Sequence, residues 1–171
     1  MHPLFHPLFI DYCAYFNGNN DYFECHEVLE EYWKEIAPKE KLHPLVGYVQ
    51  LATGMYHWRR ANFPGAMRMM SKAISNFEQN QGSEFFELID KEQLSAKMNS
   101  HLQKITANEP FTRFTLPIEN EQLQQLVAKK ISNLPFTDAQ FILNKHMLRD
   151  RSEVIAEREE SIRRNAKKTM Q

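Results

Sequence analysis

Two residue types that often shape small proteins are scarce in this chain. Its 171 residues include only five glycines and two cysteines, Cys13 and Cys25. Two cysteines without CxxC spacing form no disulfide framework, and we expect both thiols to be small buried side chains in a reducing cytosol. Sparse glycine beside abundant leucine, glutamate, lysine, glutamine and methionine favours a helical protein.

Long apolar runs and a strong net charge are also missing. No run approaches the roughly 18 apolar residues of a membrane-spanning helix. Residues 1–10 contain no Lys or Arg, so they do not resemble a signal peptide. The net charge of −1 provides no overall field that would attract nucleic acid or an acidic membrane. We therefore expect a cytoplasmic protein that has no membrane partner.

Apolar residues do recur at helical spacing along most of the chain. Proline, glycine and capping residues divide this pattern into segments. The predicted helices span Pro7 to Asn17, Asp21 to Ala37, His43 to Asn62, Pro64 to about residue 81, one or two segments within 83–108, Glu121 to Asn133, and a last helix from Thr137 through Leu148. The sequence thus predicts an all-α, compact bundle of about six or seven helices, with residues 1–148 as a single domain.

One stretch departs from the helical period. Residues 108–120, "NEPFTRFTLPIEN", alternate in polarity and carry prolines at positions 110 and 117. This pattern predicts an extended connector, or a short strand, that lies on the helices. In the helix that follows, the side chains expected to point inward are Leu123, Leu126, Val127 and Ile131.

Residues 149–171 lose the apolar stripe and carry seven basic and five acidic side chains. We interpret this segment as a charged, solvated helical tail. The alternative is an arm that binds a partner, in which the basic cluster Arg163, Arg164, Lys167 and Lys168 contacts phosphate. No aromatic residues are interleaved with these charges, so the indication of nucleic-acid binding is weak.

The helix predicted from Asp21 to Ala37 contains the most chemically suggestive stretch, "NDYFECHEVLEEYW". Asp21 and Glu24 have the spacing of a capping box. On a helical wheel, one broad face is expected to point inward and contains Tyr22, Cys25, Leu29, Tyr32, Trp33 and Ile36. His26 lies at the edge of that face, Glu30 follows it one turn later, and Glu27 lies between the inward and the solvated sides.

The next predicted helix contains a second set of residues along one strip: Gly47, Gln50, Gly54, His57 and Ala61. Glycine inside a helix costs about 0.5–1 kcal/mol relative to alanine, so two glycines on one strip indicate close approach of another helix. If the helix of His26 crosses this strip, His26 and Glu30 meet Gln50 and His57.

Two interpretations of such a cluster remain open. In the first, which we favour, the side chains form a buried hydrogen-bond network that stabilises the fold and catalyses no reaction. In the second, His26, Glu30 and His57 hold a divalent metal and Glu27 acts as a base. The stretch "HEVLE" differs from the zinc motif HExxH because Glu30 replaces the second histidine.

The segments "FNGNNDYFECHEVLEEYW" and "GYVQLATGMYHWRRANFPGA" together resemble the bacterial domain of unknown function 309, over about residues 8–75. The matching positions are Phe16, Asn17, Tyr22, Phe23, Glu24, His26, Glu27, Glu30, Trp33, Gln50, His57, Asn62, Gly65 and Ala66. The resemblance implies a small helical bundle and places Glu27 within the motif. It implies no activity.

The candidate site is therefore a polar seam formed by His26, Glu27, Glu30, Gln50, His57 and Asn62. As the function, we expect a non-catalytic helical module that binds a protein partner or forms a homo-oligomer, and that requires no cofactor. The alternative is a metal-dependent, hydrolase-like enzyme that uses the His/Glu/His set.

Overall fold

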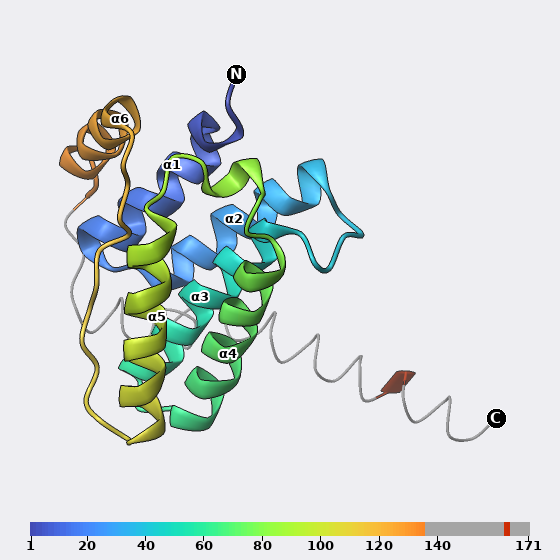
Figure 1. Ribbon diagram of the computed structural model, residues 1–171, viewed down its shortest axis with the longest axis vertical. Helices are drawn as coiled ribbons and strands as arrows, with labels where there is room; N and C mark the ends of the chain where they lie inside the picture. Colours follow the sequence, from blue (N-terminus) through green and yellow to red (C-terminus); the bar gives the residue numbers. More distant parts are fainter. Residues whose placement is uncertain (136–162, 165–171) are drawn as a thin grey trace.

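The computed structural model describes residues 1–135 and 163–164 and confirms the all-α prediction (Figure 1). Within residues 1–135 the α-helices are α1 (Pro7–Ala14), α2 (Tyr22–Ile36), α3 (Pro44–Arg59), α4 (Phe63–Gln79), α5 (Lys91–Thr106) and α6 (Glu121–Ser132). Shorter turns of helix are η1 (Pro3–Phe5), η2 (Tyr15–Asn19), which is a π-helix that prolongs α1, and η3 (Glu84–Phe86). The predicted boundaries agree with these bounds to within about three residues.

Three of these helical segments begin with the same tripeptide, His-Pro-Leu. His2, His6 and His43 precede η1, α1 and α3, and each imidazole Nδ1 accepts a hydrogen bond, 3.1 Å long, from the N–H of the leucine two residues later. The proline between them occupies the first helical position, where its missing N–H costs nothing. A nitrogen that accepts carries no proton, so each cap requires the imidazole in its neutral form.

The central element is α3, which is buried on most of its surface, as its all-round apolar sequence predicts. It packs between α2 and α4, and α5 lies along α4 (Figure 1). Its two glycines both face α4. A Cβ on Gly47 would collide with Asn76 Oδ1 and lie 2.6 Å from the Phe77 ring, and one on Gly54 would lie 3.2 Å from the Met70 backbone nitrogen. The helix that closely approaches the glycines of this strip is therefore α4 rather than α2, the helix whose crossing was considered from the sequence.

Residues 108–120 form the predicted extended connector. The connector follows α5 and contributes the buried side chains of Phe114 and Leu116 to the core. Its strand character is limited to an isolated antiparallel bridge between Ile89 and Ile118. Asn17 fastens it to the N-terminal region: the Leu116 N–H donates to Asn17 Oδ1 at 2.8 Å, and Arg113 Nη2 donates to the Asn17 carbonyl at 2.9 Å.

After the connector, α6 packs against α1 at the side of the bundle (Figure 1). Lys130 Nζ pairs with Asp11 Oδ1 at 3.2 Å, and Leu123 and Val127 are buried one turn apart. Leu126 was predicted to point inward and is 36% exposed. The prediction was wrong because α6 lies at the periphery, where its packing on α1 and η2 covers only a narrow stripe.

A second departure is Ile36, predicted to point inward and 45% exposed. Ile36 is the last residue of α2 and follows the exposed Lys34 and Glu35. The apolar pattern of the sequence therefore extends beyond the part of α2 that other elements cover. No helix within the described ranges is long and apolar enough to cross a membrane.

The last predicted helix, from Thr137, and most of the charged tail fall outside the residues that the structure describes, as do Lys167 and Lys168 of the basic cluster. Arg163 and Arg164 are described, and both are helical and exposed. The division into a domain at 1–148 and a tail at 149–171 stays a prediction.

Candidate functional site

The motif residues of α2 form a ladder of charged and polar side chains along that one helix. The two imidazole nitrogens of His26 approach two carboxylates: Nδ1 lies 3.4 Å from Glu27 Oε1 and Nε2 lies 3.3 Å from Glu30 Oε2. The other oxygen of Glu30 lies 3.0 Å from Lys34 Nζ, one further turn along. The side chains of His26 and Glu30 are each 33% exposed, and that of Glu27 is 39% exposed.

Glu30 joins the two ends of this ladder. Glu30 lies one turn after His26 and one turn before Lys34, the spacing at which side chains on one helix face become neighbours. Because the pairs are partly exposed, water screens them, and each contributes at most about 1 kcal/mol to stability. The two carboxylates approach different nitrogens of the same imidazole ring.

His57 and Asn62 form a separate cluster at the junction of α3 and α4. Asn62 caps α4, because its Oδ1 accepts from the Gly65 N–H at 3.1 Å, and its Nδ2 lies 3.3 Å from His57 Nδ1. An amide NH₂ only donates, so His57 Nδ1 is the acceptor and the ring is neutral. Burial, followed by the charges of Arg60 and Arg68, lowers the pKa of His57, which agrees with a neutral ring.

Gln50, the remaining member of the predicted seam, has a buried Oε1 without a hydrogen-bond partner. In residues 1–135, no hydrogen bond or ion pair joins His26, Glu27 or Glu30 to Gln50 or His57. Aromatic rings connect the two groups instead. The Phe23 ring lies 6.4 Å from His26 and 6.1 Å from Tyr56, whose ring is 6.0 Å from that of His57.

The structure therefore brings together His26, Glu27 and Glu30, and separately His57 and Asn62. The meeting expected from the sequence depended on the helix of His26 crossing the strip of Gly47, Gln50, Gly54, His57 and Ala61. It is α4 that packs on the two glycines of that strip. Whether these residues form a functional site stays a prediction.

The predicted ligands of the metal site are His26, Glu30 and His57. Within the described ranges, the structure contains no group of three or more His, Cys, Asp or Glu side chains arranged to hold a metal ion. Of the three predicted ligands, His26 and Glu30 belong to the α2 ladder, and His57 belongs to the α3–α4 junction.

The two cysteines behave as predicted from their scarcity. Cys13 and Cys25 are both buried and free. Burial raises the pKa of each thiol, and Cys25 Sγ donates to the Tyr12 carbonyl at 3.4 Å. A buried, protonated thiol is a poor nucleophile, so these residues contribute packing.

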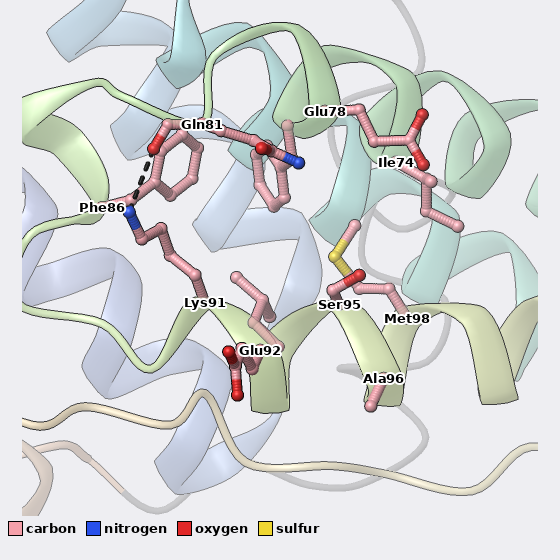
Figure 2. Close-up of a pocket in the computed structure, with 11 residues that line it drawn as sticks. Ile74, Glu78, Gln81, Phe86, Lys91, Glu92, Ser95, Ala96 and Met98 are labelled. Atoms are coloured by element: carbon pink, nitrogen blue, oxygen red, sulfur yellow. Dashed lines mark hydrogen bonds between the residues drawn. The ribbon is translucent and has the colours of Figure 1, made fainter.

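Sequence reasoning missed a groove between α4 and α5, with a volume of about 530 Å³ (Figure 2). Its lining residues are Ile74, Phe77, Glu78, Gln81, Phe86, Lys91, Glu92, Leu94, Ser95, Ala96 and Met98. The apolar side chains Ile74, Phe77, Leu94 and Met98 recur at helical spacing, and this pattern predicts inward-facing stripes rather than a groove. The apolar face of α4 offered a sequence signal for this groove, because it includes Ile74 and Phe77 in addition to Ala73. In the structure Ala73 is buried, whereas Ile74 and Phe77 stay partly exposed.

Comparison with known proteins agrees with the resemblance seen in the motif. The model of the family described as "Domain of unknown function (DUF309)" matches residues 9–69, which extend from within α1 to the first part of α4. The chain is also 37% identical, over 166 residues, to the uncharacterized protein YpuF of Bacillus subtilis (strain 168), covering 93% of this chain and 95% of that protein. No solved structure matches the chain. With this family match and a relative aligned over nearly its whole length, the chain belongs to the DUF309 family.

Proposed function

We propose that the protein is a non-catalytic helical module that binds a partner protein in the groove between α4 and α5. The observation that carries this proposal is the groove itself, which has an apolar floor and a polar rim. Phe86, Leu94 and Met98 form the floor and are at most 2% exposed. Apolar grooves between helices are a common docking site for peptide segments.

The rim supports docking of a protein segment rather than enclosure of a small molecule. Six lining residues are exposed: Glu78, Gln81, Lys91, Glu92, Ser95 and Ala96. Small-molecule sites bury about 70–90% of their ligand. A groove with so many exposed lining residues stays open along its side and suits a ligand that continues beyond it.

The state of the ionisable side chains in the motif supports a non-catalytic role. His26 is placed between Glu27 and Glu30, and His57 is held by Asn62 at a helix junction. Acid–base catalysis requires a base within reach of a substrate proton and an oriented partner at the same place. In the α2 ladder both carboxylates lie beside His26 on their own helix, and Glu30 also pairs with Lys34.

Site-specific crosslinking tests the proposal. A photoreactive amino acid at Ser95, on the groove side of α5, is expected to crosslink one predominant protein in cells. Ser100 is also exposed and lies nearly half a turn around the axis of α5 from Ser95, so it provides a matched control. Adducts that are the same at both positions, or absent at both, would contradict docking in the groove. An adduct with a second copy of this chain would identify the partner as the protein itself.

A metal-dependent, hydrolase-like enzyme is the second candidate function. The carboxylates of Glu27 and Glu30 lie within 3.4 Å of the ring nitrogens of His26, and imidazole and carboxylate are ligand types that divalent metals bind. Elemental analysis of protein purified without a histidine tag tests it. Stoichiometric zinc, manganese or iron that a chelator removes, with a fall in melting temperature, would support this candidate. Sub-stoichiometric metal and an unchanged melting temperature would eliminate it.

A further inference from the structure

We infer that the partner segment in the α4–α5 groove is an amphipathic helix with basic residues on either side of a short apolar stripe. This inference rests on the proposed function and specifies the chemistry of the partner. It follows from the length of the groove and from the charges on its two rims.

The groove is about two helical turns long. On α5 the lining residues extend from Lys91 to Met98, and on the facing side they extend from Ile74 to Glu78 of α4 and on to Gln81 in the turn that follows α4. Seven residues at 1.5 Å each span about 10 Å, the length of two turns. A helical ligand places apolar side chains on one face at i, i+4 and i+7 over the same distance. The partly exposed Ile74 and Phe77, backed by the buried Phe86, Leu94 and Met98, provide the apolar surface for such a stripe.

The rim charges favour a basic ligand. Glu78 projects from the α4 side and Glu92 from the α5 side (Figure 2). The only other charged lining residue, Lys91, donates through Nζ to the Gln81 carbonyl at 3.0 Å and closes one end of the groove. In residues 1–135, neither Glu78 nor Glu92 forms a salt bridge. The two carboxylates can thus pair with Lys or Arg on both flanks of the stripe.

A set of three designed helical peptides, titrated into the full-length protein, tests this chemistry. All three carry the same leucine stripe, and the flanking positions are all Lys, all Gln or all Glu. We expect the Lys peptide to bind about three- to tenfold more tightly than the Gln peptide, because each rim pair contributes a modest free energy, and the Glu peptide to bind most weakly. Raising the salt concentration should reduce the difference.

Charge reversal in the protein provides the matched control. The variant Glu78→Lys/Glu92→Lys is expected to invert the preference, so that the Glu peptide binds best. The variant Glu31→Lys/Glu119→Lys makes the same charge change at two exposed residues outside the groove and should leave the order unchanged. A gain of binding to the Glu peptide cannot arise from misfolding, so the inversion separates recognition from loss of structure.

The outcomes also separate this inference from the proposed function. Equal binding of the three peptides, all blocked by Ser95→Trp and none by Ser100→Trp, would overturn the basic-helix inference while leaving docking in the groove intact. Peptide binding that Ser95→Trp does not reduce, or no binding by any peptide, would overturn both.

Discussion

Gly47 shows how a single missing side chain sets the distance between two helices. The buried Asn76 of α4 occupies the space beside it, and Asn76 Nδ2 donates to the His43 carbonyl at 3.1 Å. The close approach of α3 and α4 and the attachment of the α2–α3 turn therefore depend on the same pair of residues.

Replacing Gly47 with alanine is expected to destabilise the protein by about 1–3 kcal/mol, because the new methyl group forces Asn76 and Phe77 to move in a packed core. This loss exceeds the helix-propensity gain of up to about 1 kcal/mol. Urea unfolding provides the measurement. Gly82→Ala is the matched control, since a Cβ there has no neighbour within 4 Å, and its effect should stay within about 0.5 kcal/mol.

His43 is expected to make stability fall in mild acid. Burial lowers the pKa of His43, opposed by the nearby Glu40 carboxylate, and its Nδ1 must stay unprotonated to accept from the Leu45 N–H. The folded pKa lies below the unfolded value of about 6.5, so the unfolded chain binds the proton more readily. The stabilisation is therefore complete above that value and is lost as the pH falls below it.

The variant His43→Asn tests this expectation, because asparagine caps helices well and does not titrate near neutral pH. Urea midpoints measured between pH 7.5 and 5.5 should fall less steeply for the variant than for the natural chain. The dependence of the urea midpoint on pH should not vanish in the variant, since burial also lowers the pKa of His57 and of His101. Parallel midpoint curves for the two proteins would show that the His43 cap does not titrate as described.

At the scale of elements, Arg59 joins the end of α3 to two other segments. Its guanidinium carbon lies 4.8 Å from the centre of the Tyr22 ring at the start of α2 and 5.8 Å from that of Phe111 in the connector. Its Nη1 donates at 2.7 Å to the carbonyl of Asn20, which has a positive φ of 56°. A single planar cation thus holds three segments of the chain together.

We expect Arg59→Lys to destabilise the fold by about 1–2 kcal/mol, because a compact ammonium group cannot reach two rings and a carbonyl at the same time as the broad guanidinium does. Arg68→Lys, on the exposed side of α4, is the matched control and should change stability by less than about 0.5 kcal/mol. Chemical denaturation of both variants gives the comparison. Equal effects would show that only the positive charge at position 59 matters.

The helices show which properties are encoded locally. Asp21, Asn62, Asp90 and Asn120 each accept from a backbone N–H three residues later, and such caps can be recognised from short sequence patterns. The exposed Leu126 shows what local sequence patterns do not encode. Periodicity gives the direction in which a side chain points, but not whether another element covers it. The candidate site was predicted less well for the same reason. The ladder from His26 to Lys34 lies within one helix, whereas the position of Gln50 and the α4–α5 groove depend on how helices pair.

At the scale of the whole molecule, Asn17 connects residues about 100 positions apart. Its Oδ1 accepts from the Leu116 N–H at 2.8 Å, and its carbonyl accepts from Arg113. These bonds hold the connector against the N-terminal region, and the connector leads directly into α6, which packs on α1.

Replacing Asn17 with alanine leaves the Leu116 N–H without its acceptor, so we expect faster hydrogen exchange at Leu116 and a stability loss of about 1–3 kcal/mol. The carboxylate of Asn17→Asp retains an acceptor and should protect the same amide. Hydrogen exchange followed by mass spectrometry or NMR measures both variants. If Leu116 exchanged equally slowly in the alanine variant, the connector would be held by packing alone.

The pairing of α1 with α6 has a consequence for the order in which the protein can assemble. The side of α1 that packs on α6 stays without that cover until more than 100 further residues have been synthesised, although α2 follows α1 directly and packs on its other side. Domains tend to fold as units during synthesis, and surface that waits for a distant partner is exposed to aggregation in the meantime. A stalled or truncated chain that ends before residue 121 would therefore display the faces of Gly18 and Asp11 that Ile131 and Lys130 normally cover.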